Sequence, residues 1–441
     1  MSRRGRGGNV LRSGTEILER TVLRKLTLRV VLFSWFLFFV SWLDRANIGY
    51  ASLSMNQDLS FSNSVYGLGA GLFFVGYAAF QLPSNLVLHK VGPRRWLAAL
   101  MIVWGLISAA FSLVRSAEWF YVLRFAMGAA EAGALPGLMV YLIRWFPARY
   151  RGVAIGNLLT AAMVALIVMG PLSTQIIRAL NGFGGWRGWQ WMFIIEAVPA
   201  VICGISCLWL LTDKISEVCW LSADERAWLA SSHTEVNQAS GGVEYPTILR
   251  LCLDPRLVAL VAVYGLWGIL NYGILMWLPL ILKSWGHLSS IQIGWLGSVP
   301  FIFALAGTII LPRSSLRTGD RAFHLIGSAT LGAFAIGASA FSPPVLAYVL
   351  ICLCAFTTFG LQPVFWTLPT GQFKGQSLAA AVAIVNTAAA VGGFLGPVIV
   401  GWIKDTTGSF SSALLALAAC SLAIAATVAF MRLPRLSPTK T

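Results

Sequence analysis

The sequence predicts an all-α membrane protein with twelve transmembrane helices in two pseudo-symmetric six-helix halves. Three observations lead to this fold class: the composition, a series of long apolar stretches, and an internal repeat. The 441 residues are 57% hydrophobic and only 11% charged, whereas soluble domains carry about 25% charged residues. The composition therefore favours a chain that is embedded in a lipid bilayer.

Apolar stretches long enough to cross a bilayer recur along the chain, since a spanning helix needs about 20 mostly apolar residues. The first set lies at 28–48, 66–88, 96–114, 119–142, 153–177 and 191–211. The second set lies at 257–282, 291–311, 323–341, 345–368, 376–402 and 410–431. The strands of an outer-membrane barrel would be alternating runs of about ten residues, so these longer runs favour helices.

Polar segments divide the chain into five parts. They are a basic N-terminal tail (1–27), an N-terminal six-helix half (28–211), a central loop (212–256), a C-terminal six-helix half (257–431) and a short tail (432–441). In the central loop Ser222 precedes Glu225 by three residues, which is the pattern of a helix capping box. We expect a short amphipathic helix there, lying at the cytoplasmic face.

The basic residues are distributed unevenly between the two sides of the predicted membrane. The chain has 32 Lys and Arg residues and a net charge of +16. Two of these residues lie inside spans, and most others fall on the side that holds both termini. The opposite side holds Arg115, Arg178, Arg187, Lys283 and Lys404. Because cytoplasmic loops are enriched in Lys and Arg, we expect both termini in the cytoplasm of a bacterial-type inner membrane, and no nucleic-acid partner.

The two halves repeat the same features at nearly the same offset. Gly92 corresponds to Gly319, 227 residues later, and Pro171 corresponds to Pro397, 226 residues later. A duplicated six-helix unit places the binding cavity between the halves, near the bilayer midplane. The loops after the second and eighth spans are the candidate gating loops, with residues Gly92, Arg94, Arg95, Arg317 and Gly319.

Short motifs follow one another along the whole chain. They are LDRANIG at 43–49, GY at 76–77, PSN at 83–85, LRF at 123–125, EAG at 131–133, WFPAR at 145–149, WLP at 277–279, QPVFWTLP at 362–369 and GGFLGP at 392–397. In their order and spacing the chain resembles the major facilitator superfamily, and within it the anion:cation symporter family of tartrate, phthalate, hydroxyphenylacetate and sugar-acid permeases. The resemblance implies the major facilitator fold and proton-coupled uptake of a small organic anion by alternating access.

Three positions depart from the pattern of the resembled family. The loop after the second span has His89 where the superfamily usually has an aspartate, and the loop after the eighth span has Leu316 at the matching place. In the eleventh span Ala390 stands where subgroup members often have a second asparagine. The first two positions bear on gating between the halves, and the third bears on which substrate fits.

Four ionisable residues lie well inside predicted spans: Asp44, Arg45, Arg124 and Glu131. A charge at the bilayer centre costs at least about 2.5–3.5 kcal/mol, so these charges, which sum to zero, are expected to compensate one another. Arg124 and Glu131 are seven residues apart and therefore share a helix face. Pairing for structure alone is one interpretation.

The second interpretation is functional. An arginine keeps its charge and presents a planar fork that matches a carboxylate. If Asp44 and Glu131 take up protons, two positive charges become free to receive a dianion, so proton uptake and anion binding favour each other. The resemblance likewise implies proton coupling for the two acids, and coupling or substrate binding for Arg45 and Arg124.

Neutral polar residues in the spans are weaker candidates for the binding cavity. We expect Tyr77, Tyr264, Trp366 and Asn386 to line it, and Gln81 and Asn271 are less favoured because such residues also bond neighbouring helices. Glu196 begins the sixth span beside an aromatic cluster and is interpreted as an interfacial anchor.

Enzymes and sensors form the rival class. No GxxxxGK[ST] or HExxH motif occurs, and the Cys and His residues do not show metal-ligand spacing. We therefore expect no catalytic residue, metal or cofactor. Among transporters, anion exchange and proton-coupled drug antiport stay open. The expected partners are a small organic anion, protons and the bilayer, and we expect the chain to function as a monomer.

Overall fold

The structure, a computed structural model, describes residues 5–232 and 250–431. All regular structure in these ranges is helical, with no strand among them. Twelve helical segments of the described chain are long and apolar enough to cross a membrane. The all-α membrane class and the twelve predicted spans are therefore confirmed. The predicted tail at 432–441 and residues 233–249 of the predicted central loop lie outside the described residues.

The first six spans are built from ten helical elements, apart from two short 3-10 turns. They are α1 (Gly5–Leu26), η1 (Thr27–Val31), α2 (Leu32–Ala46), α3 (Ile48–Asp58), α4 (Asn63–Val91), α5 (Pro93–Ala110), α6 (Ala117–Glu131) with α7 (Ala134–Trp145), α8 (Ala148–Ala179) and α9 (Gly188–Leu210). The first span, Glu16–Asp58, is longer than the predicted 28–48. Its last part was missed because its sequence is polar, yet α3 packs against α12 of the other half, where Gly49 lies beside Met276 and Pro279.

The second six spans follow a short helix in the central segment. The elements are α10 (Ala223–Ser231), α12 (Pro255–Ser284), α13 (Ser290–Thr318), α14 (Arg321–Ser339), α15 (Pro344–Phe365) with α16 (Thr367–Gln372), α17 (Gly375–Thr407) and α18 (Phe410–Phe430). The predicted helix start in the central segment is confirmed: Ser222 Oγ accepts a bond from Glu225 N at 3.2 Å, and Ser222 N donates to Glu225 Oε2 at 2.8 Å.

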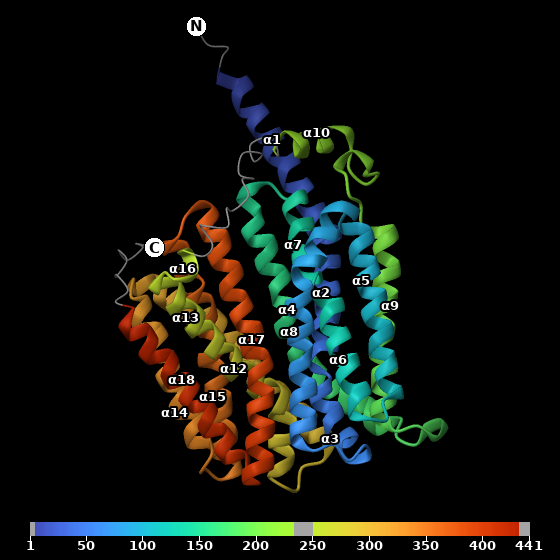
Figure 1. Cartoon of the computed structure of the whole chain (residues 1–441). Helices are drawn as coiled ribbons and strands as arrows, with labels where there is room; N and C mark the ends of the chain where they lie inside the picture. The colour runs from blue at the N-terminus through green and yellow to red at the C-terminus, as the bar shows by residue number, and fades with distance from the viewer. Residues whose placement is uncertain (1–4, 233–249, 432–441) are drawn as a thin grey trace.

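The halves lie side by side, with α4 of the first next to α17 of the second (Figure 1). Close approach between these helices requires glycine, because a Cβ on Gly67 would lie 2.5 Å from Pro397 O. The same holds for α8 and α13, where a Cβ on Gly170 would lie 2.3 Å from Gly294 O. The repeated prolines Pro171, next to Gly170, and Pro397 thus mark equivalent contacts between the halves, as expected for a duplicated six-helix unit.

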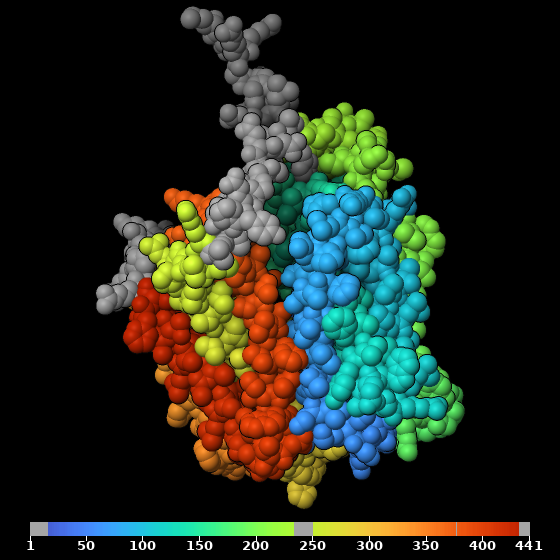
Figure 2. Space-filling model, viewed as in Figure 1, coloured from blue at the N-terminus to red at the C-terminus, as the bar shows by residue number. Residues whose placement is uncertain are grey.

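The halves are joined at the end of the molecule that holds α3. There Asp405 Oδ1 accepts a bond from Asn63 Nδ2 at 2.8 Å, Tyr66 donates to Met276 O at 2.8 Å, and Lys283 donates to Leu53 O. In Figure 2 the blue and orange-red halves meet along the lower part of the molecule and separate toward the end that holds α10. The structure is therefore closed at the α3 end and open at the α10 end.

Candidate functional site

An ion pair lies inside the N-terminal half, on the side that faces the other half. Arg45 of α2 donates to Glu131 Oε2 at the end of α6, from Nε at 3.2 Å and from Nη2 at 2.9 Å. Ser41 Oγ donates to the same oxygen at 3.3 Å. The second oxygen, Oε1, is buried and has no hydrogen-bond partner among the described residues. The carboxylate is therefore held through Oε2, and Oε1 is still able to accept a hydrogen bond or a proton.

Aromatic rings enclose the Arg45 guanidinium. Its central carbon lies 4.9 Å from the centroid of the Trp42 ring and 5.1 Å from those of Phe73 and Tyr77. Cation–π attraction of this kind is strongest where water is excluded, and only 8% of Arg45 is exposed. Tyr77, which the sequence assigned to the cavity, is thus a direct neighbour of the ion pair.

Arg124 is a second buried arginine that lies against Phe73. Its guanidinium carbon is 5.0 Å from the Phe73 ring centroid, and it donates to Gly69 O and Ala70 O of α4, each at 3.2 Å. It is 1% exposed and forms no ion pair within the described ranges. Glu131 on the same helix forms its ion pair with Arg45 of α2 instead.

Asp44 points away from the ion pair. Its carboxylate accepts bonds from Trp104 Nε1 at 3.1 Å and from Ser108 Oγ at 3.0 Å, both on α5. It is 1% exposed, and no basic group of the described chain pairs with it. The four in-span charges therefore do not form one compensated cluster: one pair forms, and Asp44 and Arg124 are held by neutral groups.

Glu196 of α9 is a third buried acid in this half. Its Oε1 accepts from Ser173 at 2.7 Å, and its Oε2 accepts from Asn47 at 3.0 Å, at the junction of α2 and α3. With 4% exposure, it lies in the interior of the bundle, and the interpretation as an interfacial anchor is wrong. A signal was present in the sequence, since an acid inside an apolar span faces the bundle interior.

The second half contributes an aromatic group from α12 and α15. Tyr264 stacks on Trp267 and Phe365, with centroids 5.0 and 4.9 Å apart. The Tyr264 hydroxyl accepts bonds from Trp366 Nε1 at 3.1 Å and from Gln362 Nε2 at 3.0 Å. Tyr264 and Trp366 are therefore brought together. Gln362 was overlooked as a site residue, although a polar amide inside an apolar span was a usable signal.

Asn386 and Tyr272 place further polar groups near the contact between the halves. Asn386 is exposed and lies seven residues before Gly393, so it shares the face of α17 that packs on Phe74. It stands closer to the open end. Tyr272 of α12, which was not a candidate, has its ring centroid 4.2 Å from that of Phe74 and lies near enough to Arg45 to interact electrostatically.

The candidate gating loops contact their own halves. Gly92 and Gly319 have φ of 87° and 69°, a conformation that glycine adopts readily, and each ends the second span of its half. Arg94 donates to Leu208 O at the end of α9, with Nε at 2.8 Å. Arg95 and Arg317 are exposed. Within the described chain no group of three or more His, Cys, Asp and Glu residues is arranged to hold a metal ion.

The sequence of the chain matches the model of the Major Facilitator Superfamily over residues 34–397. The chain belongs to this superfamily. It is therefore a multi-pass membrane transporter, and the predicted family is confirmed.

Named relatives and solved structures agree with this assignment. A protein of Agrobacterium vitis named "Putative tartrate transporter" is 43% identical over 96% of this chain and 96% of its own length. A protein of Acinetobacter baumannii named "Quinolone resistance transporter" is 36% identical over 90% of this chain and 91% of its own length. The xylose transporter XylE of Escherichia coli, in a partially occluded inward-open structure, has the same fold, with a TM-score of 0.70 at 15% identity over 95% of this chain and 100% of XylE.

Proposed function

We propose that this transporter takes up a small organic anion together with protons, with Glu131 as the coupling acid and Arg45 as the first anion-binding group. The observation that carries the proposal is the buried ion pair between Arg45 and Glu131, beside the contact between the halves. A proton on Glu131 would remove the charge that now neutralises Arg45. The guanidinium would then be free to bind a carboxylate, so that proton and anion are taken up together.

The arrangement of the arginines supports a substrate with more than one acidic group. Arg45 and Arg124 lie 5.1 and 5.0 Å from the centroid of the same Phe73 ring, so their guanidinium carbons are at most about 10 Å apart. Arg45 is 8% exposed and Arg124 is 1% exposed, so Arg45 is the more accessible of the two. Arg124 would receive the second acidic group after rearrangement. A relative named for tartrate, a hydroxy-dicarboxylate, supports this substrate class.

The orientation follows from the distribution of basic residues. With both termini in the cytoplasm, the open end that holds α10 faces inward and the closed end that holds α3 faces outward. The chain would then lie in a bacterial inner membrane in its inward-open state. A reporter fused after Thr441 that is active only in the cytoplasm supports this orientation, and periplasmic activity contradicts it.

Reconstitution in vesicles tests the transport proposal directly. Labelled tartrate should accumulate when the outside is acidic and should accumulate less when the gradient is collapsed by a protonophore. A thermal-shift panel of organic acids selects the substrate, since a ligand at 100 times its Kd stabilises a protein by about 2.7 kcal/mol. Uptake that does not depend on the proton gradient but requires an organic anion inside the vesicle would establish anion exchange and contradict proton symport.

Export of a carboxylate-bearing drug is the second candidate. The relative named for quinolone resistance favours it, because quinolones are aromatic carboxylic acids and present the same group to Arg45. The two candidates differ in direction. Stabilisation by a quinolone but by no aliphatic acid, together with extrusion coupled to inward proton flow, would favour export.

A further inference from the structure

A second hollow lies outside the region between the halves, at the open end of the N-terminal half. It has a volume of about 960 Å³ and is formed by η1 and the start of α2, the ends of α7 and α9, and the segment that leads into α10. This volume is that of a site for a small molecule. The hollow, which we call the η1–α9 groove, is separate from the Arg45–Glu131 site.

One part of the η1–α9 groove is apolar and exposed. Leu32 of α2 is 57% exposed, and Trp209 and Leu210 at the end of α9 are 77% and 61% exposed. Such side chains on spanning helices are suited to contact with lipid tails. Four tryptophans line the groove, namely Trp35, Trp145, Trp209 and Trp220. Tryptophan is enriched at the level of the lipid headgroups, so the groove crosses the boundary between the tails and the headgroups.

The other part of the groove carries positive charge. Arg29 and Arg94 line it, and neither guanidinium forms an ion pair with the described residues. Arg29 lies over the Trp220 ring at 5.4 Å, and Arg94 donates to the neutral Leu208 O. The acid that lines the groove, Glu217, is compensated by Lys214 at 3.2 Å. The Asp213 carboxylate accepts from the backbone N of Arg94 at 3.1 Å. The groove therefore offers two guanidinium groups without an ion pair among the described residues, beside an apolar surface.

We propose that the η1–α9 groove binds an anionic phospholipid. Arg29 and Arg94 would bind its phosphate, since a guanidinium fork matches phosphate oxygens, and one acyl chain would lie along Leu32 and Leu210. With the orientation proposed above, this lipid belongs to the cytoplasmic leaflet. The inference rests on that orientation but on no detail of the transport cycle.

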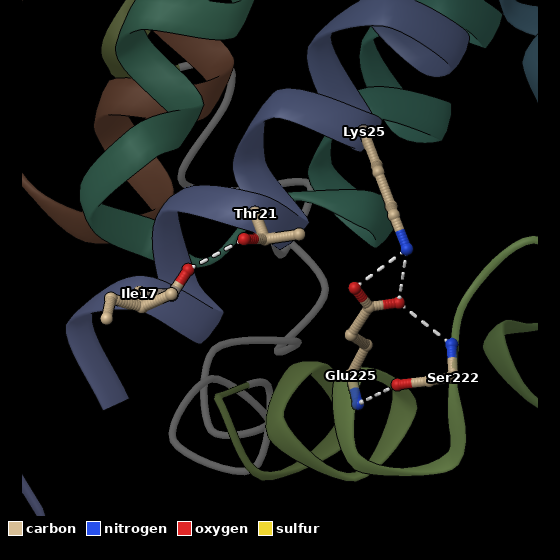
Figure 3. A network of polar contacts seen from close by, with 5 residues as sticks. All are labelled: Ile17, Thr21, Lys25, Ser222 and Glu225. Carbon is tan, nitrogen blue, oxygen red and sulfur yellow. Dashed lines mark hydrogen bonds and ion pairs between the residues drawn. The ribbon is translucent and has the colours of Figure 1, made fainter. Parts of the chain in front are cut away.

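An ion pair between Lys25 and Glu225, which we call the Lys25–Glu225 clamp, lies next to the segment that precedes α10. Lys25 of α1 donates to both carboxylate oxygens of Glu225 at 2.8 Å, and Glu225 also caps α10 through Ser222 (Figure 3). Trp220 stands two residues before that cap. The clamp therefore connects the N-terminal helix to the segment that covers the phosphate-binding part of the groove.

Native mass spectrometry of the full chain in a mild detergent measures the proposed binding. The protein is mixed with equal amounts of phosphatidylglycerol and phosphatidylcholine of the same chain length, and retained lipid is counted. We expect retention of phosphatidylglycerol over phosphatidylcholine. Arg29→Gln should reduce that preference about five-fold, as expected for one basic group near an anionic surface, and the double variant with Arg94→Gln should reduce it further.

The matched control is Arg178→Gln, an exposed arginine at the opposite end of the N-terminal half, which should leave the preference unchanged. If Arg94→Gln fails to fold, Arg29→Gln alone still tests the proposal, because the ring of Trp220 is the one contact of the Arg29 guanidinium within the described residues. An unchanged preference in Arg29→Gln overturns the proposal. Equal retention of both lipids by the parent protein, or displacement of phosphatidylglycerol by millimolar inorganic phosphate, also overturns it. Since no transport is measured, failure here leaves the proposed function untouched.

Discussion

Asp44 and Arg45 are neighbours in the sequence, but their side chains lie in different surroundings. Arg45 pairs with Glu131 at 2.9 Å, close to the other half, whereas Asp44 accepts bonds from Trp104 and Ser108 inside its own half. Successive residues of an α-helix are rotated by about 100°, so two adjacent charges need not share a partner. We therefore expect substitutions of these two residues to have different effects.

The first prediction concerns Arg45→Lys. Lysine keeps the charge but loses the fork that contacts Glu131 through two donors. We expect substrate affinity to fall about ten-fold, since a hydrogen bond to a charged group is worth about 1.5–3 kcal/mol. Binding is measured by thermal shift or calorimetry, with the exposed loop variant Arg115→Lys as control. An affinity equal to that of the control would remove Arg45 from the binding site.

The second prediction tests whether Arg124 binds substrate or only stabilises the packing of α4. Arg124 holds α4 through Gly69 O and Ala70 O, and lysine can replace at most part of this contact. If Arg124 also binds substrate, Arg124→Lys should weaken substrate affinity in protein that still folds and inserts. Uptake and affinity equal to those of the parent protein would assign Arg124 a structural role, and a lower melting temperature with normal affinity would do the same.

The sequence predicts the spans and the charged residues inside them, because length, hydropathy and helical period are local properties. It does not predict the pairing of the charges. Helical period places Arg124 and Glu131 on one face of α6, but which neighbouring side chain reaches Glu131 depends on how α2 packs there. The same limit explains Glu196, whose partners Asn47 and Ser173 come from two other helices.

The third prediction concerns the closed end of the transporter. A methyl group at Gly67 would lie 2.5 Å from Pro397 O, so Gly67→Ala should separate α4 from α17. Overpacking costs about 1–3 kcal/mol, which corresponds to about ten-fold depletion of the present conformation. Distances between spin labels on the loops at the α3 end should lengthen. Gly156→Ala is the control, because nothing lies within 4 Å of its added carbon, and equal distances in both variants would contradict the prediction.

The fourth prediction is a pH dependence at the Lys25–Glu225 clamp. Hydrogen bonds from Lys25 lower the pKa of Glu225 below its usual value. A lowered folded-state pKa contributes stability that is present above the unfolded pKa of about 4.3 and is lost as pH falls through the folded value. Glu225→Gln retains the capping pattern, so it removes only the charge.

We expect the variant to be less stable than the parent protein at pH 7, and the difference to shrink as the pH is lowered from 7 toward 3. The difference should stay below about 1 kcal/mol, because the Lys25 side chain is 39% exposed. Thermal denaturation across this pH range gives the result. Lys25→Met should show the same loss, and a stability difference that does not change with pH would rule out the charge as its source.

The fifth prediction concerns the two acids. Glu131→Gln replaces the acid with a neutral near-isostere that imitates its protonated form, so Arg45 should remain free for the substrate. We expect substrate binding and counterflow without a gradient to persist, while accumulation driven by a proton gradient is lost. Asp44→Asn leaves the Arg45–Glu131 pair intact. Its amide oxygen can accept from Trp104 Nε1, and its amide nitrogen can donate to Ser108 Oγ, which then acts as the acceptor. Its accumulation should therefore decrease less than that of Glu131→Gln.

Both variants are compared in vesicles with an imposed pH gradient and, separately, by counterflow with no gradient. Full accumulation in Glu131→Gln would contradict the coupling role of the ion pair, because the residue that pairs with Arg45 could then no longer take up a proton. Loss of counterflow in the same variant would mean that the carboxylate is needed to hold the binding site together. If Asp44→Asn abolishes accumulation while Glu131→Gln retains it, the coupling proton resides between α2 and α5 rather than beside Arg45.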